Sequence, residues 1–456
     1  MEERVKKLSR IVGPSYVIDV VDGYYAPRVN GREITVGREL LRLDAELSVL
    51  GESLASLLLP RVEFDDEVAD IVTYYRRRVV AEEYSELVSR LGPASGLVRA
   101  PSYFFPLARM SKASWLYSCI FNEVTKDLES LGREYYEYVK VLGDVGPDDL
   151  VTLRPRSRPT GNPLGGILKS VATGISVAGV YMSSILRASG CKPNYLLADP
   201  YRALVAREGL LSSECGWPSH VVEVLLGRGE CRRSSMLYAS TLCRGSDGAL
   251  VIKDYAYGTF KWLFAGIMSA AAYPFIETPA GRASNEYAKF LELRRLVRTP
   301  RVSALCITPL EATMVREYVD GESVLESEDP ASWAEAGRVL ATVHKAGYAM
   351  GDPNPGNVVI GRDGPSVIDL EQAGRFSNLK GAWDLAVFFY YARFFGRPLD
   401  LVKESVRSYV AAMGGRWKGV KSQLYNPRLM PFLLSLPVLF FELRSAVEQA
   451  EKGAGP

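Results

Sequence analysis

Two short stretches in the second half of the chain contain residues that could do chemistry. The segment AMGDPNPGNVVI spans residues 349–360 and places Asp352 and Asn357 five positions apart in a Pro/Gly-rich loop. Six residues later, VIDLEQA ends a β-like run with Asp369. Carboxylate and amide oxygens are ligands that Mg²⁺ prefers, and a carboxylate can also orient an attacking hydroxyl group. The pattern is typical of metal-assisted group transfer, although Asp352 and Asn357 taken separately are also typical turn-capping residues.

Upstream residues provide the other groups that phosphoryl transfer requires, namely a fixed cation and backbone donors that hold the phosphates. Lys253 ends the apolar run LVIK, and Gly227 and Gly229 in LLGRGE predict a turn that phosphates can approach. Glu286 on the next expected helix is the predicted ion-pair partner of Lys253, with Glu292 on the same helix as the alternative. Each residue alone also has an ordinary explanation, as a hairpin glycine or a surface lysine.

The order and spacing of these residues resemble the protein-kinase-like superfamily. In that family a catalytic Asp is followed by an Asn five positions later, and by a metal-binding Asp at the end of a later strand. Here Asp369 lies seventeen positions after Asp352. The resemblance covers roughly residues 216–450 and implies that ATP and Mg²⁺ are cofactors, that Asp352 is catalytic, and that Asn357 and Asp369 bind metal. The ATP-binding residues that it implies are Gly227, Gly229, Lys253, Glu286, Glu317 and Val319.

Two further roles come from the same resemblance. The segment REYVDG (316–321) is similar to the hinge between the two lobes of such kinases, so the backbone of Glu317 and Val319 is expected to contact adenine. Asp384 in AWDLA is expected to brace the backbone of the catalytic loop from a buried helix.

Departures from the family pattern indicate a simplified branch. Met350-Gly351 replaces the usual His-Arg before the catalytic Asp, and Asp369-Leu370-Glu371 replaces Asp-Phe-Gly. Only fourteen residues separate Asp369 from Asp384, which leaves no room for a conventional activation segment. The chain resembles the RIO-like atypical kinases and their archaeal relatives, and also the aminoglycoside and choline phosphotransferases. The long apolar insert after Lys253 favours the RIO-like branch.

The expected fold class is α+β, with a bilobal kinase-like domain after a mainly helical N-terminal domain. Residues 1–153 form that first domain, with helices expected over 38–59 and 65–91, and residues 154–215 form a linker with additional helices. Residues 216–319 are the expected small lobe, with strands in HVVEVLLGRGE, MLYASTLCR and ALVIKDY. Residues 320–456 are the expected helical lobe.

Composition narrows the class of protein. The chain has 456 residues, 47% hydrophobic and 24% charged, and a formal net charge of +2, which gives no whole-chain argument for nucleic-acid binding. The six scattered cysteines predict reduced thiols rather than a disulfide framework or a zinc site. The charged start predicts no secretory signal, and no apolar run reaches the length of a membrane span. We therefore expect a cytoplasmic protein, with a composition that leans toward a thermophile.

Three functions are consistent with these residues. The first is an ATP- and Mg²⁺-dependent kinase that phosphorylates a Ser/Thr or other macromolecular hydroxyl, with a protein partner favoured. The second is an RNA or small-molecule hydroxyl kinase, for which Arg154, Arg156 and Arg158 and the run Arg76–Arg78 would contact phosphates. The third is an ATP-binding switch or scaffold. The apolar insert 255–281 either covers the small lobe or docks a partner.

Overall fold

The computed structural model describes residues 6–11, 16–21, 24–29, 32–33, 36–37, 58, 66–112, 121–122, 124–142, 144–146, 148–154, 192–213, 215, 222, 226, 230–233, 240–246, 248–256, 272–308, 311–433 and 436–453. The chain divides into two compact units, Met1–Glu214 and Cys215–Pro456. All candidate catalytic, metal-binding and ATP-binding residues belong to the second unit. Among the described residues, no helix combines the length and the apolar character needed to cross a membrane.

The first unit mixes helices with antiparallel sheets. One sheet contains β1 (Lys6–Ile11), β2 (Tyr16–Val21), β3 (Tyr24–Val29), β4 (Arg32–Glu33) and β5 (Val36–Gly37), with β4 and β5 both paired to β3. A second sheet has the order β7 (Asp144–Val145), β8 (Leu150–Thr152), β6 (Val98–Pro101) and β9 (Val205–Ala206). The remaining elements are α2 (Asp66–Leu91), η3 (Gly92–Leu97), α3 (Phe104–Lys112), α5 (Leu128–Lys140), α7 (Tyr195–Ala198), η4 (Pro200–Ala203) and β10 (Leu210–Ser212).

The prediction of a mainly helical N-terminal domain is wrong for residues 6–37, where every described residue belongs to a strand. The β2 and β3 sequences YVIDVV and YYAPRV are rich in β-branched and aromatic residues, which favour strands. The helix expected over 65–91 is present as α2. The helix expected over 38–59 lies outside the described residues except for Leu58.

Charged residues of α2 and α3 form a dense ion-pair network inside the first unit. Arg109 contacts Glu82 and Glu83, each at 2.7 Å, and Lys112 contacts Glu83 and Glu86, each at 2.8 Å. Glu83 and Arg109 are both buried, and each has a partner of opposite charge. The network therefore joins the two helices without leaving an uncompensated charge on either residue.

The β-rich part of the second unit is an antiparallel sheet in the order β14-β15-β13-β12-β11. Its strands are β11 (Glu230–Arg233), β12 (Ser240–Gly245), β13 (Gly248–Asp254), β14 (Val302–Ile307) and β15 (Ala312–Glu317). The expected strands at MLYASTLCR and ALVIKDY correspond to β12 and β13. The strand expected in HVVEVLLGRGE is wrong at Val222 and Leu226, which are helical and pack in a core cluster with Cys243.

Helix α10 (Pro279–Leu293) contacts β14 and β15 of this sheet. Thr278 caps its first turn by accepting a hydrogen bond from the Gly281 N–H, and Pro279 occupies the first turn, where a missing N–H does no harm. The buried face of the helix carries three polar residues at helical spacing, Arg282, Asn285 and Glu286. Helix α10 therefore delivers polar groups to the interior, next to the sheet strand that carries Lys253.

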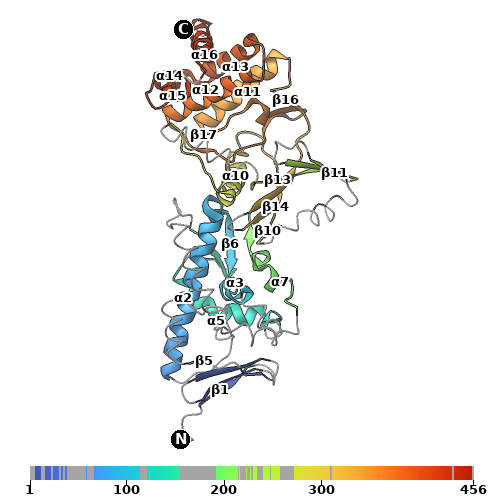
Figure 1. Cartoon of the computed structure of the whole chain (residues 1–456), viewed down its shortest axis with the longest axis vertical. Helices are drawn as coiled ribbons and strands as arrows, with labels where there is room; N and C mark the ends of the chain where they lie inside the picture. The colour runs from blue at the N-terminus through green and yellow to red at the C-terminus, as the bar shows by residue number, and fades with distance from the viewer. Residues whose placement is uncertain are drawn as a thin grey trace. The chain divides into compact units, whose positions relative to one another are not determined.

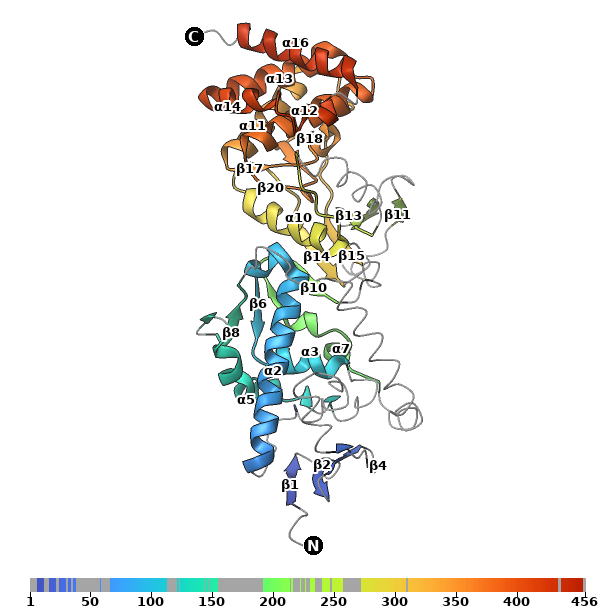
Figure 2. The same cartoon turned by 60° about the vertical axis from the view of Figure 1, so that its left-hand side comes forward.

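The remaining part of the second unit is largely helical (Figures 1 and 2). Its helices are α11 (Pro330–Lys345), α12 (Asn378–Phe394), α13 (Leu399–Met413), η6 (Gly414–Arg416), α14 (Trp417–Gln423), α15 (Met430–Leu433) and α16 (Pro437–Gly453). Helices α11 and α13 approach closely at Gly337, where an added Cβ would lie 2.1 Å from the Ser405 carbonyl oxygen. Both views show these helices gathered at the C-terminal end of the unit, with β11–β15 grouped separately.

Short strands form the loop region between these two parts. They are β16 (Glu322–Ser323), β17 (Tyr348–Ala349), β18 (Val358–Gly361), β19 (Gly364–Val367) and β20 (Gly374–Arg375), with the turn η5 (Pro355–Asn357). The hairpin predicted around the turn GRDGP is present, because β18 pairs antiparallel with β19. Asp352 precedes this hairpin and Asp369 follows it, so the hairpin returns the chain to the same region.

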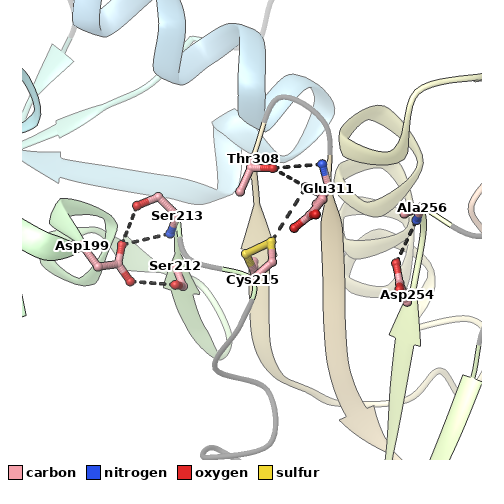
Figure 3. Close-up of a disulfide and its surroundings, with 9 residues drawn as sticks. Asp199, Ser212, Ser213, Cys215, Asp254, Ala256, Thr308 and Glu311 are labelled. Carbon is pink, nitrogen blue, oxygen red and sulfur yellow. Dashed lines mark hydrogen bonds between the residues drawn. A yellow bond between two sulfur atoms is a disulfide. The ribbon is translucent and has the colours of Figure 1, made fainter. Parts of the chain in front are cut away.

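The cysteines depart from the sequence-based expectation. Cys215 is joined by a disulfide to Cys306 in β14, and Cys231 in β11 is joined to Cys243, which lies directly opposite it in β12 (Figure 3 shows the surroundings of Cys215). The prediction of reduced thiols is therefore wrong for these four residues. Spacing along the chain could not reveal the pairs, because one bond crosses a hairpin and the other spans 91 positions.

Candidate active site

Lys253 is the centre of the candidate site. Its side chain is 8% exposed, and its Nζ lies 2.7 Å from Glu286 Oε2, 3.1 Å from Asp369 Oδ1 and 3.2 Å from Glu371 Oε2. The predicted pairing of Lys253 with Glu286 is thus present. The alternative partner Glu292 is instead paired with Lys289 at 2.6 Å. Strand β13, helix α10 and the segment after β19 meet at a single ammonium group.

The three carboxylates around Lys253 form a compact cluster. One oxygen from each of Glu286, Asp369 and Glu371 lies within 4.8 Å of the other two. Glu286 is fully buried, its Oε2 also accepts a hydrogen bond of 2.5 Å from the Tyr255 hydroxyl, and its Oε1 has no hydrogen-bond partner among the described residues. A buried carboxylate oxygen without a donor is costly unless a cation or another donor reaches it.

The cluster perturbs the ionisation of its members. Burial would lower the pKa of Lys253, but the charges of Asp369, Glu286 and Glu371 outweigh it and raise that pKa. Burial likewise works to raise the pKa of Asp369, but Lys253 and the Glu371 N–H outweigh it and lower the pKa below its usual value. Burial raises the pKa of Glu286 to about 6, against the opposing charge of Lys253. At neutral pH the charged lysine therefore faces the ionised carboxylates of Asp369 and Glu286.

Helix α10 is fixed to the segment that follows Asp369 by hydrogen bonds. Asn285 Nδ2 lies 3.1 Å from the Glu371 carbonyl and 2.8 Å from the Ala373 carbonyl. Gln372 exchanges two hydrogen bonds with the backbone of Ile276, at 2.8 and 3.0 Å. Arg282 Nη1 lies 3.5 Å from Glu371 Oε2. These contacts within the chain hold the Lys253–Glu286 pair beside Asp369.

Asp384 contacts the backbone of the loop that it was predicted to brace. Its buried carboxylate accepts hydrogen bonds from the Met350 N–H at 2.6 Å and the Gly351 N–H at 2.9 Å. His344 Nε2 lies 2.9 Å from the same carboxylate, and His344 Nδ1 lies 2.8 Å from the Tyr409 hydroxyl. The backbone just before Asp352 is thereby anchored to helices α11, α12 and α13.

The local backbone explains why a glycine occupies position 351, where the kinase-like pattern has an arginine. Its φ is +78°, and an added Cβ would lie 2.7 Å from both the Gln372 carbonyl oxygen and the Tyr273 hydroxyl. No larger residue fits this backbone conformation and space. Tyr273 itself is buried, and its hydroxyl donates to the Gln372 carbonyl at 2.8 Å. The described end of the apolar insert, residues 272–281, thus packs against the loop, while residues 257–271 lie outside the described part.

The loop beyond Gly351 positions Asp352 and Asn357. The Asp352 carbonyl accepts hydrogen bonds from the Asn354 N–H at 2.8 Å and from Asn357 Nδ2 at 3.4 Å. The Asn357 carbonyl accepts from the Ile368 N–H at 2.9 Å, which ties Asn357 to the residue before Asp369. Asp352 and Asn357 are half-buried. The three residues from the opening motif therefore belong to one connected backbone network.

Other predicted residues have mixed outcomes. Glu317 ends β15, and among the described residues no backbone group is hydrogen-bonded to the Val319 N–H. Gly227 and Gly229 lie outside the described residues, so their predicted contact with phosphates stays a prediction.

Two of the arginines proposed to contact RNA are engaged in ion pairs. Arg76 is buried and pairs with Glu134 at 2.6 Å, and Arg78 pairs with Glu82 at 2.8 Å, whereas Arg77 is exposed. The backbone N–H of Arg154 donates to the Tyr84 hydroxyl at 3.1 Å, a contact that does not involve its guanidinium group. Arg156 and Arg158 lie outside the described residues. The expected phosphate contact is wrong for the buried Arg76.

Several residues of the site were not predicted. Glu371 was visible as an acidic residue two positions after Asp369. Arg282 and Asn285 precede Glu286 by four positions and one position and are buried on the same helix. Polar residues within an otherwise apolar helix face were the signal that could have identified them. Tyr255 and Gln372 carried no such signal.

Comparisons with known proteins add little to this geometry. No family model matches the chain, and no curated protein is similar to it at a significant level. A solved structure of WbdD with a kinase inhibitor shares 17% identity over 49% of this chain and 45% of that chain, with a TM-score of 0.29. The kinase domain of PknI from Mycobacterium tuberculosis shares 16% identity over 43% of this chain and 92% of that chain, with a TM-score of 0.24. The chain spans less than half of the WbdD chain, and at these TM-scores neither similarity supports a conclusion about function.

Proposed function

We propose that the second unit is a kinase-like phosphotransferase that uses ATP and Mg²⁺. The observation that carries the proposal is the buried Lys253–Glu286 ion pair in direct contact with Asp369. A lysine held by a helix carboxylate beside a metal-binding Asp is the arrangement that phosphoryl transfer requires. In this proposal β11–β15 with α10 is the small lobe, α11–α16 is the helical lobe, and the segment around Val319 contacts adenine with its N–H group.

The residues around Lys253 fit a divalent cation. Asp369 and Asn357 offer the hard oxygen ligands that Mg²⁺ prefers, and the cluster of Glu286, Asp369 and Glu371 has one buried oxygen that lacks a donor. When bound, Mg²⁺ supplies positive charge that neutralises the phosphate oxygens. Asp369 and Asn357 would hold it, with Glu371 as the additional carboxylate.

The remaining chemistry belongs to residues of this chain. Asp352 orients the acceptor hydroxyl and takes its proton as the hydroxyl oxygen bonds to the terminal phosphorus and the bond from that phosphorus to the ADP oxygen breaks. Lys253 exchanges its direct contact with Asp369 for phosphate oxygens, while Glu286 keeps its ammonium in place. Asp384 and Gly351 fix the backbone from which Asp352 projects, so the carboxylate is positioned before substrate arrives.

The substrate proposed is a Ser/Thr hydroxyl of a protein partner, as in RIO-like atypical kinases. Two observations support a site that needs no activation segment. Asn285 and Gln372 already fix α10 to the residues after Asp369, and Met350-Gly351 leaves no arginine to bind a loop phosphate. The ion pairs of Arg76 and Arg78 give the RNA-substrate alternative less support.

The test uses ATP labelled on its terminal phosphate, with Mg²⁺, offered separately with cellular protein, RNA and small metabolites. We expect label in the protein pool with the natural chain and no label with an Asp352→Asn variant. Label in RNA or in metabolites would overturn the substrate class but keep the phosphotransferase. Free phosphate without labelled product would indicate an ATPase switch, and neither product with a folded protein would contradict the proposal.

A further inference from the structure

A polar pocket lies at the end of α10, and no residue of the Lys253 cluster lines it. It has a volume of about 540 Å³ and is lined by residues of the α10–β14 connection, the end of β15 and the β18–β19 turn. Its charged lining residues are Arg294, Arg295, Arg298, Arg301, Glu317 and Asp363. None of the candidate catalytic or metal-binding residues lines it, and Glu317, whose backbone is predicted to contact adenine, is its one candidate ATP-binding residue.

Positive charge exceeds negative charge in this pocket, with four arginines against two carboxylates. Both carboxylates contact the same guanidinium: Arg298 Nη1 lies 2.5 Å from Asp363 Oδ2, and Arg298 Nη2 lies 3.2 Å from Glu317 Oε1. Glu317 Oε2 accepts the Arg301 N–H at 3.1 Å, which leaves the Arg301 side chain unused. The acids of the pocket therefore compensate one arginine of the four.

The side chains of Arg295 and Arg301 have no hydrogen-bond or ion-pair partner in the described part of the chain, and both residues are exposed. Arg294 is held in place, because its Nη2 donates to the Pro300 carbonyl at 2.7 Å. An anion in the pocket would use the guanidinium groups of Arg295 and Arg301, which no carboxylate of the described residues contacts.

The chemistry of the pocket favours phosphate over other anions. A guanidinium fork matches the oxygen geometry of a phosphate and binds it through paired N–H donors, with a dianion gaining from several arginines together. A volume of about 540 Å³ is in the range of small-ligand sites and accommodates one phosphorylated group. We propose that this arginine pocket binds a phosphate monoester dianion, carried either by a free metabolite or by a phosphorylated residue of a protein.

Asp363 gives the proposal a distinctive second test. Its side chain is 76% exposed, so its ion pair with Arg298 is readily exchanged for another anion. A ligand phosphate would replace the Asp363 carboxylate on Arg298. An Asp363→Asn substitution should therefore tighten phosphate binding, because Arg298 then has one competing carboxylate fewer.

The experiment titrates the full chain, without ATP or Mg²⁺, with inorganic phosphate and with a phosphoserine peptide, and measures affinity by calorimetry. The expected result is binding of at least one probe that is weakened about tenfold or more in an Arg295→Ala/Arg301→Ala double variant, since hydrogen bonds to charged groups are strong. The matched control is Arg407→Ala/Arg444→Ala, two exposed arginines on α13 and α16, which should leave affinity unchanged. Asp363→Asn should bind about twofold to fivefold tighter, as expected for removal of an exposed competitor.

The two probes also distinguish the source of the phosphate. Equal affinity for both probes, lost in the double variant, assigns the pocket to free phosphate compounds, and tighter binding of the peptide assigns it to a phosphorylated protein. Unchanged affinity in the double variant would overturn the proposal. Binding that is lost instead in Lys253→Met would place the phosphate in the transfer site and would also overturn it, and so would failure of the natural chain to bind either probe.

Discussion

The two units each contain a cluster of cations and carboxylates, and the clusters differ in how their charges are matched. Between α2 and α3, Arg109 and Lys112 share three glutamates, and both cations contact the buried Glu83. In the second unit, three carboxylates contact the single Nζ of Lys253, and Arg282 adds a longer contact of 3.5 Å to one of them, Glu371. One oxygen of Glu286 there has no donor among the described residues.

The difference separates a structural network from a candidate chemical site. Matched charges stabilise a fold and need nothing more, since breaking such a buried pair leaves an uncompensated charge. The carboxylates around Lys253, of which only Glu371 also contacts Arg282 among the described residues, would be stabilised further by another cation or donor. The second arrangement is suited to a metal ion and phosphates, which would complete it when they bind.

The largest effect is expected from removing one charge of the Lys253 cluster. Asp369→Asn should lower phosphotransfer by about 10³-fold, because it removes a metal ligand where transition-state charge is stabilised. The variant should remain folded, since its side chain keeps its size. Steady-state transfer rates check this, with Asp400→Asn, an exposed residue on α13, as the control that should retain full activity. Equal rates for the two variants would contradict the assignment of Asp369.

Substitutions in the ion-pair network between α2 and α3 should lower stability and leave phosphotransfer activity unchanged. Arg109→Met should lower the free energy of unfolding of the first unit by about 3 kcal/mol, because it leaves the buried Glu83 short of positive charge. Arg133→Met removes an exposed pair with Glu129 and should change it by under about 1 kcal/mol. Denaturant titration measures both. An Arg109→Met variant with natural stability would show that the network is not structural.

The backbone before Asp352 should be sensitive to a single methyl group. Gly351→Ala should cost roughly 1–3 kcal/mol in stability and lower activity as well, because a Cβ there is strained and too close to Gln372 and Tyr273. Gly347→Ala has a similar positive φ of +90° with no atom within 4 Å of the added Cβ. The difference in stability between the two variants measures the cost of the close contacts at Gly351, because both positions have a positive φ. Equal costs for both would mean that backbone strain alone accounts for Gly351.

The smallest predicted effect is a pH dependence. The pKa of Glu286 is about 6, so its carboxylate gains a proton and loosens Lys253 as pH falls through 6, and activity should fall with it. Stability should change in the opposite sense: because the folded pKa lies above the ordinary value of 4.5, this carboxyl contributes most below pH 4.5, and the contribution is lost as pH rises through 6.

A Glu286→Gln variant tests this assignment. It should be about tenfold less active at neutral pH, since one charge-assisted hydrogen bond is lost, and its activity should no longer change near pH 6. A pH profile of kcat measures both effects. An acid limb near pH 6 that persists in the variant would assign the titration to another group.

Contacts of the candidate site could be anticipated from the sequence more readily than the strands of the first unit. Asp352, Asn357, Asp369 and Asp384 stand out because their order and spacing along the chain reflect one local loop and hairpin. The Lys253–Glu286 contact joins residues 33 positions apart, and helical spacing left Glu292 as an alternative partner. Burial decided between them, because Glu286 faces the sheet while Glu292 is exposed.

Other features depend on tertiary contacts that have no local signature. The hydrogen bonds of Asn285 and Gln372 connect segments 86 to 96 positions apart, and either amide could equally have been a surface residue. The Cys215–Cys306 disulfide depends on where β14 lies in the sheet. The strands over residues 6–37 had a recognisable composition, but the amphipathic helix patterns after them dominated the prediction for the whole domain.

The most direct test of the central claim is a calorimetric titration of ATP with and without Mg²⁺, on the natural chain and on Asp369→Asn. We expect Mg²⁺ to tighten ATP binding to the natural chain, and we expect this gain to disappear in the variant while the fold is retained. ATP binding that is absent, or that depends on neither Mg²⁺ nor Asp369, would contradict the assignment of the Lys253 cluster as a phosphotransfer site.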